Sequence, residues 1–510
     1  MISNLPKSKK RLRVSNLSNK SLIFLSLIFT SLAWTFTTPI VGIADENQYI
    51  MYANVVASGQ GYGEAKVPAY IAYVNDLKCF AGLQEVTAAC QDVKGWNKWG
   101  DDLVPIGTDG MIGGYPYPYF WIVGQPSRVF DGFEALYVMR TFAWLMACTV
   151  IGLAILHWPK THPKTMVLGF MAVFTPMVAS TFGAVNPNGF EIVAGLSLSA
   201  LLGSVLLKNG EASISNGHLA SIGLVTLALS TVKPWSFLLT ILIYGAFLGL
   251  TLIPKKLTFK SKSLNLPNLI SLRDKCLLIS FLVIASIAGW ISNATYREVM
   301  SERGSEDLVL PFWYAVRIIL GNFTIFLKEF IGILGWRDHA PQEFVLMLWM
   351  SAIIFAIIYA MRNLRYLSNL FLLLYLSVAF LALPIVSLKV LGLLGGASYQ
   401  GRYAGSLFTG IVILCVVLLQ INGKNPESLA SNELLLWVIS GFLVFNTSSL
   451  IWSFHRFSVG FPLAWERFPF EYEWIPDYWY VGLFASILSL VFPAMLARSI
   501  GKTRSDIGTE

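Results

Sequence analysis

Charged residues are scarce in this chain of 510 residues, of which Asp, Glu, Lys and Arg make up only 13%. Soluble domains carry about twice that fraction. By contrast, 55% of the residues are hydrophobic, and apolar stretches long enough to cross the ~30 Å hydrocarbon layer recur along the chain. The composition therefore predicts an all-α polytopic membrane protein, because a membrane β-barrel would show short alternating segments instead.

Cysteine and histidine are equally rare, with five residues of each. No CxxC pair occurs, and no His/Cys cluster has the spacing of a zinc site. A P-loop, a dinucleotide glycine fingerprint and a zinc-protease motif are also missing, so we predict no metal site and no certain cofactor. The first long loop contains the acids Asp76, Asp92, Asp101, Asp102 and Asp109. They show no trusted ligand spacing, and dependence on a divalent cation stays open.

Twelve apolar stretches are expected to span the membrane. They are residues 21–41, 136–157, 165–183, 191–207, 219–232, 236–253, 276–292, 344–361, 367–388, 403–421, 433–453 and 479–497. Ten or eleven is the alternative count, if 219–253 is a broken pair or a re-entrant element. We expect one membrane domain over residues 21–497, between a basic N-terminus (1–20) and a short tail (498–510).

The distribution of charge predicts the orientation. Residues 1–20 hold six Lys and Arg and no acid, and positive flanks stay in the cytoplasm. Twelve crossings then also place the basic loop 254–275 and the C-terminus in the cytoplasm. Loop 42–135 falls outside, with 11 acids against 5 bases, a net charge of −6. The other long outer segments are 293–343, 389–402 and 454–478.

Three features of the outer segments carry structural expectations. Residues 47–59 mix apolar and polar side chains and could form an interfacial helix that stops at Gly59. Residues 311–334 are apolar but carry charges, which favours a surface helix or a re-entrant pair over a full span. Cys79 and Cys90 are expected to form a disulfide in an oxidising compartment, with two free thiols as the alternative.

The acidic pair Asp45-Glu46 follows the first span and begins the longest outer loop. Ionisable groups at the end of a membrane helix are costly to keep there, so they are functional candidates by default. A carboxylate in this place could act as general base on an acceptor hydroxyl. The alternative is an acidic helix cap or a salt-bridge partner.

Basic residues near the outer face are candidate ligands for a donor phosphate, which Arg matches with two parallel hydrogen bonds. They are Arg402, Lys233 and Arg337. The alternative is an internal ion pair with an acid such as Asp45 or Glu191. The two interpretations stand level for Arg402, whereas the ion pair is favoured for Lys233 and for Arg140 inside the second span.

Amide and aromatic side chains at the same face are candidate substrate contacts. They are Tyr117, Asn186, Asn188, Gln400 and Tyr403. Sugar rings stack on aromatic faces, and amides hydrogen-bond to sugar hydroxyls. The alternatives are an interfacial aromatic belt for the aromatic residues and a Pro/Gly turn before a helix for the two asparagines.

Several motifs occur in a fixed order over roughly residues 20–420: IADENQYIMYANVVASGQG, YPYPYFWIVG, ALYVMRTFAWLMAC, VNPNGFE, TVKPW, GILGWRDHAP and YQGRYAGSLF. In this order they resemble an uncharacterised bacterial membrane-protein family that is grouped with the GT-C glycosyltransferases. The resemblance implies a GT-C fold, a base at Asp45 with Glu46 beside it, and contact between Arg402 and the donor phosphate. Two departures are a missing His-Pro-Pro-like run at YPYPY and a missing acid near Asn188.

The function that we expect is therefore an inverting glycosyltransferase of the bacterial plasma membrane. It would move a sugar from a polyprenyl-phosphate donor to a glycan or lipid acceptor of the cell envelope. Nucleotide sugars would need a soluble binding domain, which the sequence lacks, and no nucleic-acid partner is expected. The alternatives are a transporter or flippase of a lipid-linked glycan and an assembly partner without activity.

Overall fold

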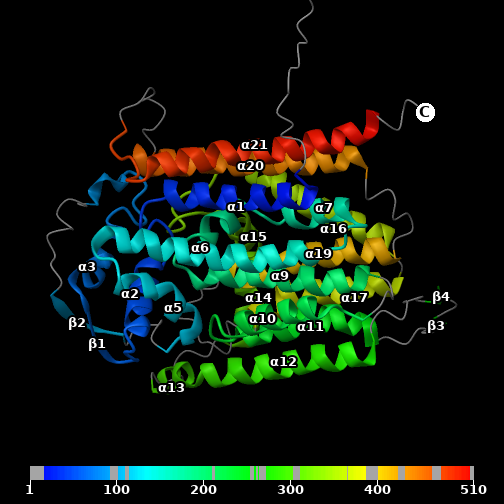
Figure 1. Ribbon diagram of the computed structural model, residues 1–510, viewed down its shortest axis with the longest axis horizontal. Helices are drawn as coiled ribbons and strands as arrows, with labels where there is room; N and C mark the ends of the chain where they lie inside the picture. Colours follow the sequence, from blue (N-terminus) through cyan, green and yellow to red (C-terminus); the bar gives the residue numbers. More distant parts are fainter. Residues whose placement is uncertain are drawn as a thin grey trace, which may run out of the picture.

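Long apolar helices run side by side along the length of the molecule (Figure 1). The computed structural model describes residues 17–91, 102–108, 114–208, 213–252, 258–259, 262–263, 271–302, 311–364, 366–385, 400–422, 431–461 and 472–505. Within these ranges nine helical spans are long and apolar enough to cross a membrane. The described part is therefore mainly helical, with the apolar helices of a multi-pass membrane protein.

The nine spans are formed by α1 (Asn19–Thr37), α6 (Gly132–His157), α9 (Pro187–Leu207), α12 (Leu272–Ser292), α16 (Glu343–Asn363), α17 (Tyr366–Ser377) continued by the π-helical η5 (Val378–Ala382), η6 (Gly401–Ala404) continued by α19 (Gly405–Asn422), α20 (Asn432–Ser458) and α21 (Trp479–Ser505). Each matches one of the twelve expected stretches. The three others correspond to shorter helices, so the count of twelve stays a prediction.

Prolines account for the short helices. α7 (Pro163–Met171) and α8 (Pro176–Phe182) cover the expected span 165–183 but meet at an angle of 83°, and each begins with a proline. α10 (Asn216–Ser230) and α11 (Ser236–Leu252) have 15 and 17 residues and are separated by a turn that contains Pro234. Proline lacks the N–H that a continuous helix needs at that point.

The centre of the bundle is α9, whose 21 residues are all buried. A helix that is apolar all round belongs inside a bundle. Small residues let its neighbours approach: a Cβ on Gly195 would lie 2.4 Å from the Cβ of Ser406 on α19, and one on Gly189 would lie 2.0 Å from the Thr181 carbonyl oxygen on α8. The first turn of α9 is therefore held firmly beneath the site described below.

The first long loop gathers at one end of the bundle, and the strands β3 (Thr258–Phe259) and β4 (Lys262–Ser263) lie at the opposite end (Figure 1). The loop contains α2 (Glu46–Ala57), β1 (Glu64–Pro68), α3 (Ala69–Ala72), η1 (Tyr73–Lys78), η2 (Ala88–Cys90), β2 (Leu103–Gly107), α5 (Tyr117–Gly124) and η3 (Gln125–Arg128). β1 and β2 pair antiparallel, with Glu64 opposite Gly107. The described parts of loops 42–135 and 254–275 thus lie at opposite ends, and which end faces the cytoplasm stays a prediction.

The expectation of an interfacial helix over 47–59 is wrong. α2 is helical and ends just before Gly59, which has φ +74°, but ten of its twelve residues are buried. α5 covers it so closely that a Cβ on Gly124 would lie 2.0 Å from the Ala53 carbonyl oxygen. Polar residues of α2 find partners inside the fold, as in the 2.9 Å bond from Nδ2 of Asn54 to Oγ of Ser127.

The remaining helices lie in the segment 293–343. They are α13 (Ala294–Glu302), α14 (Phe312–Gly321) and α15 (Phe323–Ile331). α14 and α15 are separated at Asn322, and whether the segment 311–334 is a surface helix or a re-entrant pair stays a prediction. The disulfide between Cys79 and Cys90 is formed, with 6.2 Å between their Cα atoms.

Candidate functional site

Asp45 and Arg402 lie in direct contact although 357 residues separate them in sequence. Nη2 of Arg402 donates to Oδ2 of Asp45 at 2.8 Å. The Arg402 side chain is 5% exposed, whereas the Asp45 side chain is 35% exposed. The guanidinium is therefore enclosed and the carboxylate is accessible from outside, which is the arrangement of a ligand-facing pair.

The backbone around Asp45 is strained. Asp45 has φ +68° and Val41 has φ +63°, a region that β-branched residues rarely adopt. Asp45 precedes α2 but its side chain does not cap that helix. Strained positions persist only where the surroundings hold them, and they cluster at functional sites. The strain here directs the Asp45 side chain away from its own helix and toward Arg402.

Glu46 anchors this loop through four buried hydrogen bonds. Its Oε1 and Oε2 accept hydrogen bonds from Nε and Nη2 of Arg140 at 2.7 and 2.6 Å, and also from the backbone N–H groups of Val185 and Val41. Both side chains are 1% exposed or less. The ion pair favoured for Arg140 is confirmed, and Glu46 is placed as an anchor of the loop with no side open to a ligand.

Arg140 extends the same anchor to the end of α1. Its Nη1 donates to the carbonyls of Thr35 and Thr38 at 3.1 and 2.8 Å, and its Nη2 donates to that of Pro39 at 2.7 Å. A cation at a helix C-terminus satisfies the last carbonyls and interacts favourably with the helix dipole. The loop from α1 to Asp45 is therefore fixed from both sides.

Arg402 is held by its own backbone neighbour. The N–H of Gly401 donates to Oε2 of Glu329 at 2.6 Å. A Cβ on Gly401 would lie 1.9 Å from the Phe326 carbonyl oxygen, so only glycine allows this approach to α15. Among the described residues, Nε of Arg402 is buried without a hydrogen-bond partner. An enclosed guanidinium with an unsatisfied N–H is a site for an anion or another acceptor.

Arg337 contacts Glu329, the acid that binds the N–H of Gly401. Its guanidinium forms an ion pair with the Glu329 carboxylate, which is 3% exposed, while the Arg337 side chain is 40% exposed. Arg337 has φ +63°. Its turn touches the Asp45 loop, since Nε1 of Trp336 donates to the Val41 carbonyl at 2.8 Å. One buried acid thus connects Arg337 to the backbone of Gly401, the residue before Arg402.

The turn that carries Arg337 is braced from behind by Asp338. Oδ2 of Asp338 accepts from Nη2 of Arg456 at 2.8 Å, and its Oδ1 lies 2.8 Å from Nδ1 of His339. Arg456 also donates to the carbonyls of Phe80 and Leu83, inside the disulfide loop. Burial raises the pKa of Asp338, but His339 and Arg456 together outweigh it and hold the pKa below its ordinary value.

Lys233 forms the buried ion pair that was favoured for it. Its Nζ lies 3.0 Å from Oε2 of Glu191 and 2.6 Å from Oδ1 of Asn188. The ammonium also lies 5.0 Å from the centre of the Tyr403 ring, and the Arg402 guanidinium lies 5.8 Å from the same ring. Lys233 is therefore connected to the site through Tyr403, with its own charge already matched by Glu191.

The asparagines at the start of α9 connect these groups. Oδ1 of Asn186 accepts from the Asn188 N–H at 2.9 Å and caps the helix, and its Nδ2 donates to the Ala44 carbonyl. Nδ2 of Asn188 donates to the Tyr49 hydroxyl at 3.3 Å. Both asparagines are buried. They lie beside the site, and they position Ala44 and Lys233.

Of the two remaining candidates for substrate contact, Tyr117 lies apart from this network and Gln400 adjoins it. Tyr117 is 41% exposed on α5, with its ring 6.4 Å from that of Tyr52. Gln400 is half-buried, and its carbonyl accepts the N–H of Tyr403 at 3.0 Å. Tyr49 is nearer to the pair than Tyr117. Burial raises its pKa well above the ordinary value, and the Asp45 carboxylate raises it further, so its hydroxyl stays protonated.

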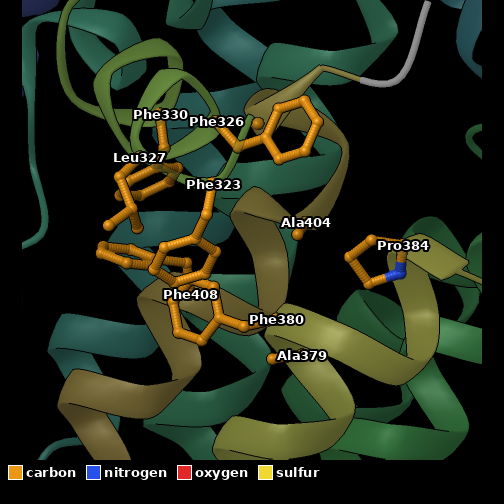
Figure 2. A pocket seen from close by; sticks show the side chains of 10 residues that line it. Phe323, Phe326, Leu327, Phe330, Ala379, Phe380, Pro384, Ala404 and Phe408 are labelled. Atoms are coloured by element: carbon orange, nitrogen blue, oxygen red, sulfur yellow. The ribbon is translucent and has the colours of Figure 1, made fainter. Parts of the chain in front are cut away.

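An apolar cavity of about 230 Å³ ends next to this site. Its walls come from α15, α16, α17, η5 and α19, and they are Phe323, Leu327, Ile331, Met350, Ile353, Ile354, Ile357, Ile358, Leu376, Phe380 and Phe408. Figure 2 shows the smaller cavity beside it, which shares four of these residues and is also lined by Gly401 and Ala404. Apolar space therefore extends from between the spans to the residue before Arg402.

The described residues contain no group of three or more His, Cys, Asp or Glu side chains that could hold a metal ion. Of the loop acids considered from the sequence, Asp92, Asp101 and Asp109 lie outside the described residues. Dependence on a divalent cation therefore stays open.

Comparison with known families places the chain. A family described as "Predicted membrane protein (DUF2142)" matches residues 28–414. The chain belongs to the DUF2142 family. The match includes Asp45, Arg337 and Arg402, and it agrees with the expected kinship to an uncharacterised membrane-protein family, while the GT-C link stays a prediction. No curated protein and no solved structure matches the chain.

The site of this DUF2142 protein includes residues that sequence reasoning missed. Glu329 bridges Arg337 and Gly401, and Tyr49 lies against Asp45 and Asn188. Glu329 did carry a signal, because a carboxylate within an apolar segment is costly and marks a functional candidate. Tyr49 lies in the first turns of α2, but nothing in the sequence marked it as part of the site.

Proposed function

We propose that this protein is a membrane glycosyltransferase of the GT-C type, which moves a sugar from a polyprenyl-phosphate donor to a cell-envelope acceptor outside the cytoplasm. The observation that carries the proposal is the 2.8 Å contact of Asp45 with Arg402, beside an apolar cavity. A carboxylate, a guanidinium and an apolar cavity are the three parts that such a reaction needs.

The basic groups support a phosphate ligand. Arg402 is enclosed, and within the described ranges its Nε lacks a partner. Arg337 contacts Glu329, which binds the N–H of Gly401 beside Arg402. Guanidinium groups bind phosphate with two parallel hydrogen bonds. Lys233 is a weaker candidate for direct contact, because Glu191 and Asn188 already occupy its ammonium. We assign it the role of positioning Tyr403 and, through that ring, Arg402.

The cavity supports a lipid on that phosphate. Its walls are entirely apolar, and the smaller space next to it reaches Gly401 and Ala404, the residues on either side of Arg402 and Tyr403. A sugar phosphate without a lipid would leave this space unfilled. An isoprenoid chain would bury apolar surface there, at about 25 cal/mol for each Å² removed from water.

The proposed chemistry is a single displacement. The acceptor hydroxyl gives its proton to the Asp45 carboxylate while its oxygen forms a bond to the anomeric carbon of the sugar. The bond from that carbon to the phosphate oxygen breaks, and the electron pair leaves with the phosphate. Arg402 and Arg337 stabilise the departing polyprenyl phosphate electrostatically. Attack from the face opposite the leaving group inverts the anomeric centre.

The decisive experiment compares cell-envelope glycans by mass spectrometry. Cells that lack the gene are complemented with the wild-type chain, with Asp45→Asn or with Glu343→Gln. Glu343 is a matched control, since it is an exposed carboxylate paired with Lys328 outside the site. We expect a glycan that is lost without the gene, restored by wild type and by Glu343→Gln, and reduced about 100-fold or more with Asp45→Asn. Full restoration by a well-expressed Asp45→Asn chain would remove Asp45 from the mechanism.

The alternative function, transport or flipping of a lipid-linked glycan, is favoured by one feature. α7 and α8 are bent by 83°, and a second break near Pro234 adjoins the buried Lys233–Glu191 pair. Broken helices with buried charges are typical of transporters. Reconstituted vesicles separate the two functions, because a transporter moves its substrate across the membrane without forming a new glycosidic bond.

A further inference from the structure

We propose that the Asp45–Arg402 ion pair is an exchangeable latch: the donor phosphate takes the place of the Asp45 carboxylate on Arg402, and Asp45 becomes a free base only once the donor is bound. This inference rests on the proposed function, because it takes the same phosphate ligand. It adds an order of binding, donor before acceptor, and an autoinhibited resting state.

Two neighbouring ion pairs show why one can exchange and the other cannot. Glu46 and Arg140 share two hydrogen bonds, and both side chains are 1% exposed or less. Asp45 and Arg402 share the single 2.8 Å contact given above, and the Asp45 side chain is 35% exposed. Breaking a buried, bidentate pair strands a charge away from water. Opening a single contact to an accessible carboxylate lets water take over one partner.

Arg402 is the partner that stays in place when the latch opens. Its side chain is 5% exposed, its ring neighbour Tyr403 lies within 5.8 Å, and the preceding Gly401 N–H is bound to Glu329. Within the described ranges, the one side-chain hydrogen bond of Asp45 is that with Arg402, and its side chain does not cap α2. A phosphate that arrives at Arg402 finds one N–H already unsatisfied, the Nε, and competes with Asp45 for the other side of the guanidinium.

Turning the Asp45 side chain needs little movement elsewhere. The next residue, Glu46, is locked by four hydrogen bonds, and the preceding Ala44 N–H is bound to the Gly335 carbonyl at 3.2 Å. The backbone on either side is therefore fixed, and rotation about the side-chain bonds of Asp45 is enough to open the contact. The released carboxylate stays at the mouth of the site, next to the departing sugar bond.

The latch predicts that removing the Asp45 carboxylate strengthens phosphate binding. This change in affinity can be measured without knowing the sugar. The full-length protein is placed in phosphatidylcholine nanodiscs, and binding of farnesyl phosphate, farnesol and inorganic phosphate is measured by calorimetry. If Asp45 competes with phosphate, Asp45→Asn binds farnesyl phosphate and inorganic phosphate more tightly than wild type, by roughly threefold to tenfold. Asp45→Ala should also bind the two phosphates more tightly than wild type. Farnesol should bind wild type and the Asp45 variants equally.

The opposite role for Asp45 predicts the opposite sign. If the carboxylate instead orients Arg402 for the donor, both Asp45 variants bind the two phosphates more weakly or no better than wild type, and this result overturns the latch. Glu343→Gln is the matched control, because it removes a carboxylate from the Lys328 pair outside the site. We expect it to change neither affinity by more than about twofold.

Arg402→Lys and Arg402→Gln separate failure of the latch from failure of the proposed function. Both should weaken binding of the two phosphates and leave farnesol unchanged. If wild type binds neither phosphate, or if both Arg402 variants bind them as wild type does, the donor site is wrong and the latch fails with it. If Arg402 is required but the Asp45 variants bind no more tightly, the donor site stands and the latch alone is rejected.

Discussion

Asp45 and Glu46 are adjacent acids of the same chemistry, yet the fold gives them opposite environments. Glu46 is enclosed with Arg140 beneath the loop that it anchors, and Asp45 stands accessible over the enclosed Arg402. A single peptide bond thus separates an enclosed acid from an accessible one. The difference teaches that a membrane protein can compensate the cost of a charge in two ways, by complete pairing or by partial exposure. Only a partly exposed group can also contact a substrate.

Enclosed and accessible charged groups are also separated around the turn that carries Arg337. The brace of Asp338, His339 and Arg456 holds the disulfide loop and the turn of Arg337 from behind, with all three side chains buried. In front, the Arg337 side chain is 40% exposed. Rigid supports behind and open groups in front are what a preorganised site requires. If the two sets of groups differ in this way, substitutions of the buried brace residues should lower stability. Substitutions of the exposed Arg337 should lower activity.

The largest effect is expected from breaking the enclosed pair. Arg140→Leu leaves the Glu46 carboxylate buried without a cation, which costs about 3–5 kcal/mol of folding stability. We expect little folded protein in the membrane and a strongly lowered unfolding temperature in detergent. Asp45→Asn, one residue from Glu46, should change stability by less than about 1 kcal/mol, because its pair is partly exposed.

Equal destabilisation by Arg140→Leu and Asp45→Asn would erase the distinction between the two regions. Stability is measured by thermal unfolding of the purified chains, with the amount of folded protein in membranes as a second readout. A double variant, Glu46→Leu with Arg140→Leu, sharpens the test, since replacing both partners removes the stranded charge and should recover part of the loss.

An intermediate effect is expected from the disulfide. Replacing Cys79 and Cys90 by serine removes the closure of a short loop, worth about 2–3 kcal/mol in the chain-entropy model. Because Arg456 binds carbonyls within that loop, we expect faster amide hydrogen exchange over residues 80–87. Exchange over α9 should be unchanged, and acceleration there would contradict a local role for the brace.

Much of the fold could be predicted from the sequence because a bilayer allows few solutions. Backbone groups must be satisfied internally, so apolar runs become helices. The failure at 47–59 has a physical reason: the polar side chains of α2 find partners such as Ser127 inside the fold, and a sequence pattern cannot reveal partners 73 residues away. The break between α10 and α11 was visible at Pro234, although whether these two helices cross the membrane was not.

The site was only partly predictable. The sequence marked Asp45 and Glu46 as a pair and marked Arg402 and Arg140 as needing partners, but adjacency alone could not say which acid meets which arginine. That assignment depends on the strained backbone at Asp45, which turns its side chain away from that of Glu46. Glu329 was noticed only as a charge that argued against a span, because its partner Gly401 has no side chain to signal a contact.

The smallest effect is the dependence of stability on pH that the Asp338 carboxyl of the brace contributes. The pKa of Asp338 lies below its ordinary value of 3.8, because His339 and Arg456 outweigh the effect of burial. A carboxyl whose pKa is lower in the folded state adds stability above its unfolded pKa and loses it only as the pH falls through the folded value. The unfolding temperatures of wild type and Asp338→Asn should therefore differ by a constant amount between about pH 8 and pH 5 and converge below about pH 4. Convergence already between pH 7 and pH 5 would mean that another group, with a higher pKa, carries the brace.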